Sequence, residues 1–264
     1  MEVILNGGRA NSGNVVRIDD QVARPSHPQS ASVDHFLQFL VNAGIATAPE
    51  PFGLDDRGRR RFRYFEGTAP TPPYPDWAFG QDLMIEVATG QRALHEAAQS
   101  YQAPESAEWA TTAGDYFPAA ALQGQDLVVC HNDLGMSNVI VNDAKQLVGF
   151  IDFDYSRPVD RLFDIAVAVR HWAPFGNLDI VDGPKLDRVG RFGTFCDVHE
   201  LDADQRHRVV LLATSFLEHA RRNITNLAAA GNEGFQTLLA DGYEQTNLAT
   251  VAWLKDRLET LAAT

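Results

Sequence analysis

Polar side chains stand at the ends of short apolar runs in the middle of the chain. The segment 128–154 alternates β-rich runs with polar turns and carries His131, Asp133, Asn138, Asp152 and Asp154. Carboxylates and an amide that apolar strands deliver to one edge offer the hard oxygen ligands that Mg²⁺ prefers. An aspartate in that place can also accept the proton of a hydroxyl group. The pattern therefore indicates a metal and phosphate site rather than part of the core.

The spacing of these residues narrows the chemistry. The segment HNDLGMSN fits H-x-D-x-x-x-x-N, the catalytic loop of the protein-kinase-like fold, with Asp133 as the residue that orients and deprotonates a hydroxyl. Asn138 and the later Asp152 fit the two groups that hold Mg²⁺ against the phosphates of ATP. We place His131 in the catalytic loop as well, and favour a role in orienting the loop over one as general base.

Three segments of the chain resemble one family. HNDLGMSN, GFIDFD and PVDRLFDIA are similar to motifs of the aminoglycoside phosphotransferase and choline kinase-like superfamily. In that superfamily ATP phosphorylates a hydroxyl of a small molecule. More narrowly, CHNDLGMSNVIV and GRFGTFCDVHEL resemble bacterial phosphotransferase-like proteins often described as trifolitoxin immunity proteins. The resemblance runs over nearly the whole chain, and its catalytic-loop motif is specific for the fold but says little about the substrate.

The resemblance implies an α+β, two-lobed protein-kinase-like fold, with ATP bound between the lobes. Residues 1–66 are expected to form a small antiparallel β lobe that clamps the nucleotide, and residues 67–264 a larger, mainly helical lobe for catalysis and substrate binding. The Pro-rich stretch 69–75 is the natural boundary. Helical periodicity and breaking residues predict helices over 32–43, 76–101, 162–171, 202–230 and 243–261.

The first 66 residues supply candidates for nucleotide contacts. A glycine-rich loop between two strands can close over phosphates, because its backbone N–H groups can bind an anion. The resemblance gives this role to Gly7, Gly8 and Ser12, and it implies an adenine pocket at Tyr64, Phe65 and Glu66.

The lysine that kinases carry on the third strand is absent, since the three lysines of the chain all lie beyond residue 140. Arg24 occupies the matching place and is expected to pair with phosphates, although its planar fork differs from an ammonium group. The following helix contains no glutamate. Asp34, His35 and Gln38 are open alternatives as partners of Arg24.

Other charged residues receive structural interpretations. We interpret the arginines of 57–61 as a solvated turn, Asp160 as a helix cap and Asp164 as support for the catalytic loop. Asp154 has two open alternatives. It contacts a substrate amine, or Mg²⁺ through water, if the strand continues past Asp152, and otherwise it is a turn carboxylate.

Composition restricts the partners. Residues 1–66 carry eight Arg and eight Asp or Glu, so the formal net charge of −13 belongs to the rest of the chain. This balance argues against nucleic acid or an anionic membrane surface as the main partner. A cationic acceptor would be favoured if acidic groups line the cleft. The sequence has no signal peptide, no membrane-spanning run and no disulfide pattern, which indicates a cytoplasmic protein.

The sequence thus predicts a small-molecule kinase that uses ATP and Mg²⁺ to phosphorylate a hydroxyl acceptor. Two alternatives stay open. One is a non-catalytic or weakly catalytic binding or immunity protein on the kinase scaffold, which the missing lysine and glutamate favour. The other is a metabolite kinase of the choline or homoserine type.

Overall fold

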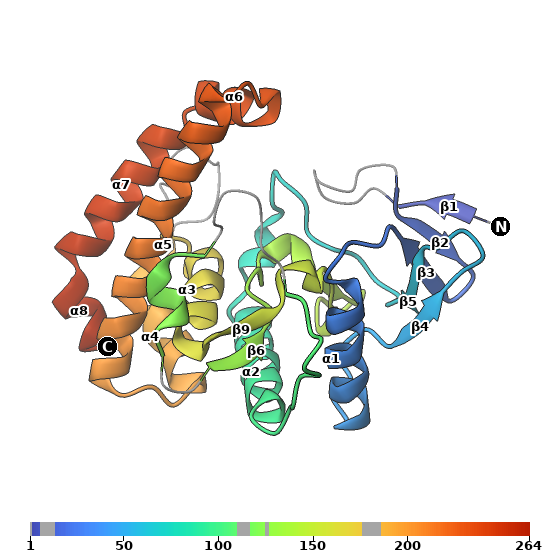
Figure 1. Ribbon diagram of the computed structural model, residues 1–264. Helices are drawn as coiled ribbons and strands as arrows, with labels where there is room; N and C mark the ends of the chain where they lie inside the picture. Colours follow the sequence, from blue (N-terminus) through green and yellow to red (C-terminus); the bar gives the residue numbers. More distant parts are fainter. Residues whose placement is uncertain (1, 6–13, 110–116, 125–126, 176–185) are drawn as a thin grey trace.

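A five-stranded antiparallel sheet with one helix forms the first part of the molecule (Figure 1). The computed structural model describes residues 2–5, 14–109, 117–124, 127–175 and 186–264. The strand order is β1-β2-β3-β5-β4. The elements are β1 (Glu2–Ile4), β2 (Val16–Ile18), β3 (Gln21–Arg24), α1 (Ser30–Asn42), β4 (Pro51–Leu54) and β5 (Arg60–Arg63). The predicted antiparallel β region is confirmed.

The second part is mainly helical and contains two short antiparallel strand pairs, β6 with β9 and β7 with β8. Its strands are β6 (Leu127–Cys130), β7 (Val139–Val141), β8 (Leu147–Phe150) and β9 (Arg157–Asp160). Its helices are α2 (Gln81–Ala98), α3 (Arg161–Trp172), α4 (Arg188–Val198), α5 (Ala203–Ala229), α6 (Glu233–Ala240), α7 (Tyr243–Asp256) and α8 (Leu258–Ala262). Short 3₁₀ turns η1 (Asp76–Phe79), η2 (Ala119–Leu122), η3 (Met136–Asn138) and η4 (Phe153–Tyr155) join them.

Helix α3 is the centre of the helical part. It is apolar on most sides and is buried along nearly its whole length, as expected for a helix enclosed by other elements. Helices α4 and α5 and strand β6 pack against it. At its end the buried indole of Trp172 donates a hydrogen bond to the carbonyl of Leu134 at 3.1 Å. The core therefore contacts the catalytic-loop segment directly.

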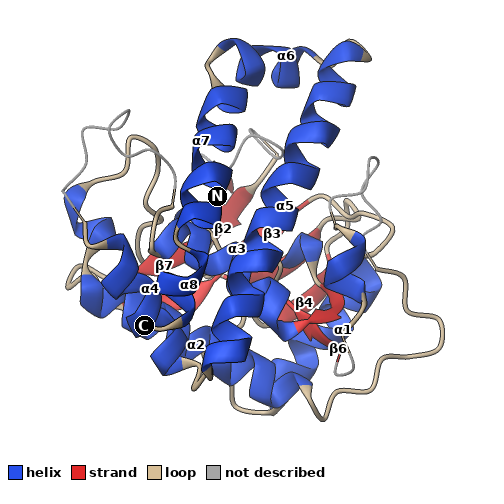
Figure 2. Ribbon diagram, turned by 90° about the vertical axis from the view of Figure 1, so that its left-hand side faces the viewer, coloured by secondary structure: helices blue, strands red, loops and turns tan. Residues whose placement is uncertain are grey.

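Helices α5 and α7 form an arm that extends beyond the rest of the helical part. They pack side by side, and α6 lies across their far end (Figure 2). None of the residues of α6 is buried. No helix in the described part of the chain is long and apolar enough to cross a membrane.

Two predicted helices are divided in the structure. The helix predicted over 76–101 begins as the 3₁₀ turn η1, and α2 starts only at Gln81, because Gly80 has an extended backbone (φ −56°, ψ 139°). Asp76 therefore does not cap the long helix. The helix predicted over 243–261 is interrupted at Arg257, whose backbone leaves the helical region (φ −113°, ψ 11°).

The connection between the two parts passes very close to the β7–β8 hairpin. Thr68 and Val141 exchange two backbone hydrogen bonds, of 2.9 and 3.1 Å. The preceding Gly67 has a φ of +150°, and a Cβ atom placed there would overlap the carbonyl oxygen of Val141. Only glycine meets both conditions, since it adopts positive φ freely and has no side chain.

We expect Gly67→Ala to lower the free energy of unfolding by about 2–3 kcal/mol, since it combines an unfavourable φ with a steric overlap. Urea unfolding of the purified protein would measure this loss. Gly58→Ala is the matched control, because Gly58 also has positive φ (+74°) but open space around it. Equal losses in the two variants would show that the close approach to Val141 is not required.

Candidate active site

The catalytic loop leaves strand β6 and is oriented by a histidine. The ring of His131 is buried (1% exposed) and lies between two backbone groups. Its Nε2 donates to the carbonyl of Ile151 at 2.9 Å, and its Nδ1 accepts from the backbone N–H of Asp133 at 3.2 Å. This pair of contacts requires a neutral ring with its proton on Nε2. The geometry matches the expected orienting role of His131.

A buried carboxylate supports the loop from below. Asp164, which is 1% exposed, accepts hydrogen bonds from the backbone N–H of Asn132 at 2.5 Å and from Gln91 and His95 at 2.7 Å each. Burial alone would raise the pKa of Asp164, but the hydrogen bond and charge of His95 and the further contacts hold it below its ordinary value. The predicted support of the loop by Asp164 is confirmed.

Asn132 itself is held in an uncommon backbone conformation, with a φ of 65°. Its side-chain amide donates to three backbone carbonyls, those of Cys130, Tyr155 and Arg157. These contacts offset the cost of left-handed backbone in a residue other than glycine. Asp160, as predicted, caps helix α3 by accepting from the N–H of Leu162 at 3.0 Å.

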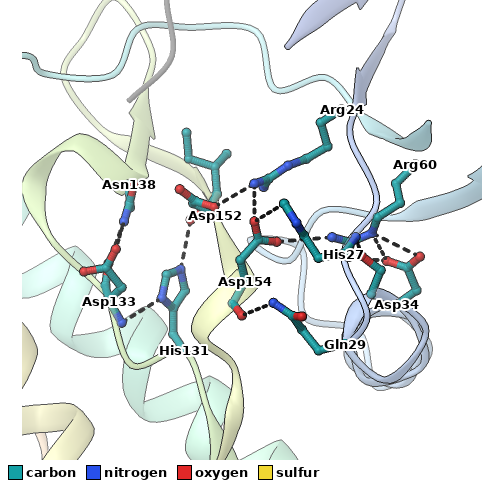
Figure 3. Close-up of polar contacts among 12 residues, drawn as sticks. Arg24, His27, Gln29, Asp34, Arg60, His131, Asp133, Asn138, Asp152 and Asp154 are labelled. Carbon is teal, nitrogen blue, oxygen red and sulfur yellow. Dashed lines mark hydrogen bonds and ion pairs between the residues drawn. The ribbon is translucent and has the colours of Figure 1, made fainter. Parts of the chain in front are cut away.

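Asp133 and Asn138 are joined side by side (Figure 3). The amide nitrogen of Asn138 donates to Asp133 Oδ2 at 3.0 Å and to the Asp133 carbonyl at 2.7 Å. No hydrogen bond within the described residues engages the amide oxygen of Asn138. Burial, with a further contribution from the charge of Asp152, raises the pKa of Asp133 to about 6. A carboxylate with such a pKa is suited to accept a proton near neutral pH.

Asp152 follows strand β8 in left-handed conformation, with φ 67° and ψ 55°. Its side chain is about one-third exposed and lines the same cavity as Asn138. One amide oxygen and one carboxylate at the edge of a cavity are the donor set that Mg²⁺ takes in nucleotide sites. The residues predicted as metal ligands thus fit such an ion, and the ion itself remains a prediction.

Arg24 projects from β3 towards this edge and pairs with two carboxylates. Its Nη2 lies 3.0 Å from Asp152 Oδ1 and also contacts Asp154 Oδ2. None of the three alternatives on the following helix, Asp34, His35 or Gln38, is its partner. Their helix is instead tied down by Arg60, as Figure 3 shows.

Arg60 is 2% exposed, although the sequence placed it in a solvated turn. That interpretation is wrong for Arg60. Its Nε and Nη2 donate to Asp34 at distances from 2.5 to 3.3 Å, and its Nη1 donates to Asp154 Oδ1 at 3.2 Å. The interpretation fits Arg57 and Arg59 better, since these two pair with carboxylates at the sheet surface.

The sheet register explains why this charge cluster exists. Arg24 and Arg60 stand directly opposite each other in the β3–β5 pair, where like charges destabilise a sheet. Asp154 lies against both guanidinium groups and offsets that repulsion. We name Arg24, Arg60, Asp34, Asp152 and Asp154 the arginine–aspartate cluster. The alternation of Arg60 and Phe62 on the inward face of β5 is the only sequence signal for it.

Of the two alternatives for Asp154, the structure fits the turn carboxylate. Strand β8 ends at Phe150 and the chain turns into η4, so Asp154 does not continue the strand face of Asp152. Both of its carboxylate oxygens are engaged by arginines, and its side chain is 16% exposed. The role as a substrate-binding carboxylate is not supported, because two cations already occupy it.

A cavity of about 770 Å³ lies between the five-stranded sheet and the β7–β8 hairpin. Its lining is largely apolar and includes Tyr64 and Phe65, two of the residues predicted for adenine. Glu66 does not line it, since its exposed side chain pairs with Arg17 at 3.0 Å. Gly7, Gly8 and Ser12 lie outside the described residues. The cavity has the size and the mixed lining of a cofactor site.

A second group of potential metal ligands is His95, Cys130 and Asp164, whose ligand atoms lie within 4.8 Å of one another. Both oxygens of Asp164 already accept hydrogen bonds. Burial raises the pKa of Cys130 well above its ordinary value, so the thiol stays protonated and is a poor metal ligand. This cluster is structural.

Part of the chain matches a known protein family, and the whole fold matches solved structures. Residues 78–183 match the model of a family described as the phosphotransferase enzyme family. This chain has the fold of the small-molecule phosphotransferases. The phosphotransferase fold is shown by solved structures that match nearly end to end, whereas no curated protein matches the chain. The predicted fold class is therefore confirmed.

Three of these structures show how broad the phosphotransferase fold is. A choline/ethanolamine kinase family protein from Mesorhizobium loti is 17% identical, with a TM-score of 0.63 over 98% of this chain and 92% of that one. A microcompartment-associated aminopropanol kinase is 15% identical, with a TM-score of 0.67 over 100% of this chain and 94% of that one. Aminoglycoside 2'-phosphotransferase-IIIa is 14% identical, with a TM-score of 0.60 over 94% of this chain and 92% of that one. The narrower resemblance to trifolitoxin immunity proteins stays a prediction.

We expect Arg60→Met to lower the free energy of unfolding by about 1–3 kcal/mol. The change keeps the volume but leaves Asp34 and Asp154 without their buried partner, and the partial exposure of both carboxylates reduces the cost below that of a fully buried pair. Urea unfolding measures it. Arg61→Met, one residue along the same strand, is the control and should cost less. A loss at Arg61 equal to that at Arg60 would contradict the proposed weight of the cluster.

We also expect the protein to lose stability as the pH falls from 7.5 to 5.5. Burial, aided by the nearby His95, keeps the pKa of His199 well below its usual value, so the ring stays neutral in the folded protein and takes up a proton on unfolding. The unfolded state binds more protons, so one such histidine costs about 1.4 kcal/mol over this interval. Between these two pH values the free energy of unfolding should change less in His199→Phe than in wild type. His207→Gln is the control, because His207 is partly exposed, and it should resemble wild type. An undiminished difference would refute this origin.

Proposed function

We propose that the protein transfers the γ-phosphoryl group of ATP to a hydroxyl of a small molecule. The observation that carries this proposal is that Asn138 and Asp152 line one cavity, while Asp133 is hydrogen-bonded to Asn138 at 3.0 Å. The family match over 78–183 and the phosphotransferase fold support it. In this proposal residues 1–66 form the nucleotide-clamping lobe and residues 67–264 the catalytic and acceptor-binding lobe.

Each residue has a role that follows from its contacts. Asp133, held by Asn138 and by the His131-anchored loop, accepts the proton of the acceptor hydroxyl as that oxygen attacks phosphorus. Asn138 and Asp152 would hold Mg²⁺, which neutralises charge on the phosphates when it is bound. Arg24 supplies a cation at the same edge. Most of the rate gain comes from positioning and charge stabilisation.

The remaining nucleotide contacts are assigned by the resemblance. Gly7, Gly8 and Ser12 would close over the phosphates, while Tyr64 and Phe65 enclose the adenine and the backbone near Glu66 meets its edge. The two cysteines are buried and unpaired, which together with the use of ATP fits a cytoplasmic enzyme.

For the acceptor we propose a hydroxylated amine. The solved structures with this fold include kinases named for choline, ethanolamine, aminopropanol and aminoglycosides. The acidic excess beyond residue 66 is consistent with a cationic acceptor. An aminoglycoside acceptor would make the protein an antibiotic-resistance enzyme, and an amino alcohol would make it a metabolite kinase.

A non-catalytic binding or immunity protein is the second candidate. The observation that favours it is the missing strand lysine, together with the pairing of Arg24 to the carboxylates Asp152 and Asp154. A thermal-shift measurement with Mg-ATP, followed by ADP release over a panel of amino alcohols and aminoglycosides, separates the candidates. No stabilisation at millimolar Mg-ATP would favour the binding protein.

We expect Asp133→Asn to reduce turnover by at least about 10³-fold while leaving nucleotide affinity within about threefold, because the side chain keeps its shape but loses its basicity. Asp152→Asn should instead weaken Mg-ATP binding. ADP-release kinetics and calorimetric titration with a non-hydrolysable ATP analogue measure the two effects. Turnover by Asp133→Asn at the wild-type rate would refute the assignment of the base.

A further inference from the structure

One nitrogen atom of Arg24 serves two carboxylates. Its Nη2 contacts both Asp152 Oδ1 and Asp154 Oδ2, while the buried Nε of the same guanidinium has no hydrogen-bond partner in the described part of the chain. Asp152 is the carboxylate that the proposed function assigns to the metal. The guanidinium of Arg24 thus occupies Asp152 Oδ1, a carboxylate oxygen that a divalent cation would need as a ligand.

Asp154, by contrast, is fixed from several sides. Arg60 holds its second oxygen at 3.2 Å, and Asp34 on α1 holds Arg60. The amide of Gln29 reaches the Asp154 carbonyl at 3.5 Å, and His27 Nε2 lies 3.8 Å from its Oδ2 (Figure 3). Arg24 can therefore leave Asp152 and still keep a rigid carboxylate partner.

We propose that Arg24 is a counter-ion shared between Asp152 and Asp154, and that nucleotide phosphates draw it off Asp152 as the divalent cation takes its place. This inference rests on the proposed function. Asp154, backed by Arg60 and Asp34, is then the positioning residue for the phosphate-binding cation. It takes the place that kinases of this fold class give to a glutamate on the helix.

The charges of the arginine–aspartate cluster explain why binding of the divalent cation and binding of the nucleotide phosphates should strengthen each other. Two guanidinium groups face three carboxylates, and Asp152 without Arg24 would add an unpaired negative charge beside Asp133. A divalent cation alone must compete with Arg24 for Asp152. With phosphates present, Arg24 gains new acceptors and the metal gains a free ligand, so each ligand strengthens the binding of the other by the same factor.

The test measures Mn²⁺ binding by electron paramagnetic resonance, with and without a non-hydrolysable ATP analogue. Wild type should bind Mn²⁺ at least about fivefold more tightly with the analogue. Arg24→Gln should bind Mn²⁺ several-fold more tightly than wild type without nucleotide, because the competing cation is gone, and should gain less from the analogue. Arg61→Gln removes the same charge from the neighbouring strand without contacting Asp152 or Asp154, and should resemble wild type.

Asp154→Asn should change the affinity for Mn²⁺ in the opposite direction. It leaves Arg24 with Asp152 as its only charged partner, so Mn²⁺ binding without nucleotide should weaken.

A general loss of structure would weaken binding in both variants, and tighter binding by Arg24→Gln excludes that explanation. Unchanged or weaker Mn²⁺ binding by Arg24→Gln, or tighter binding by Asp154→Asn, would overturn the inference. Wild type that binds neither Mn²⁺ nor nucleotide would overturn the proposed function as well, whereas a gain from the analogue that is as large in Arg24→Gln as in wild type would overturn only the shared counter-ion.

Discussion

The helical part of the molecule is organised around the buried carboxylate of Asp164. Asp164 joins helix α3 to helix α2 through Gln91 and His95, and to the catalytic loop through the backbone of Asn132. A charge in an apolar core is tolerated only when its hydrogen bonds are all present. The three elements must therefore meet in one arrangement. The position of Asp133 follows from that arrangement rather than from contacts at the surface.

The charges that connect the two parts of the molecule are of a different kind. The arginine–aspartate cluster joins the five-stranded sheet to the turn after β8, and its carboxylates remain partly exposed. Exposure keeps the cost of breaking a pair low, because water can replace a lost partner. The buried hydrogen bonds to Asp164 fix the geometry of the loop, whereas the partly exposed ion pairs of the arginine–aspartate cluster remain free to exchange.

Contacts between residues close in the chain were predictable from the sequence, and contacts between distant segments were not. Asp133 and Asn138 belong to one loop and are hydrogen-bonded, and Asp160 caps the helix that begins beside it, so local spacing was enough to predict these contacts. The pairing of Arg24 depends on where the turn after Asp152 lies against strand β3. Arg60 was misassigned because a buried arginine is rare and its partners are 26 and 94 residues away in the chain.

The arm of α5, α6 and α7 contributes little to the core. Helix α6 contributes no buried residue, and only the inner stretches of α5 and α7 meet the core. Lengthening or shortening the outer turns would alter the outline of the molecule while leaving the folding free energy of the rest of the helical part almost unchanged. Changes in the length of the arm would therefore leave the positions of Asp133, Asn138 and Asp152 unaltered.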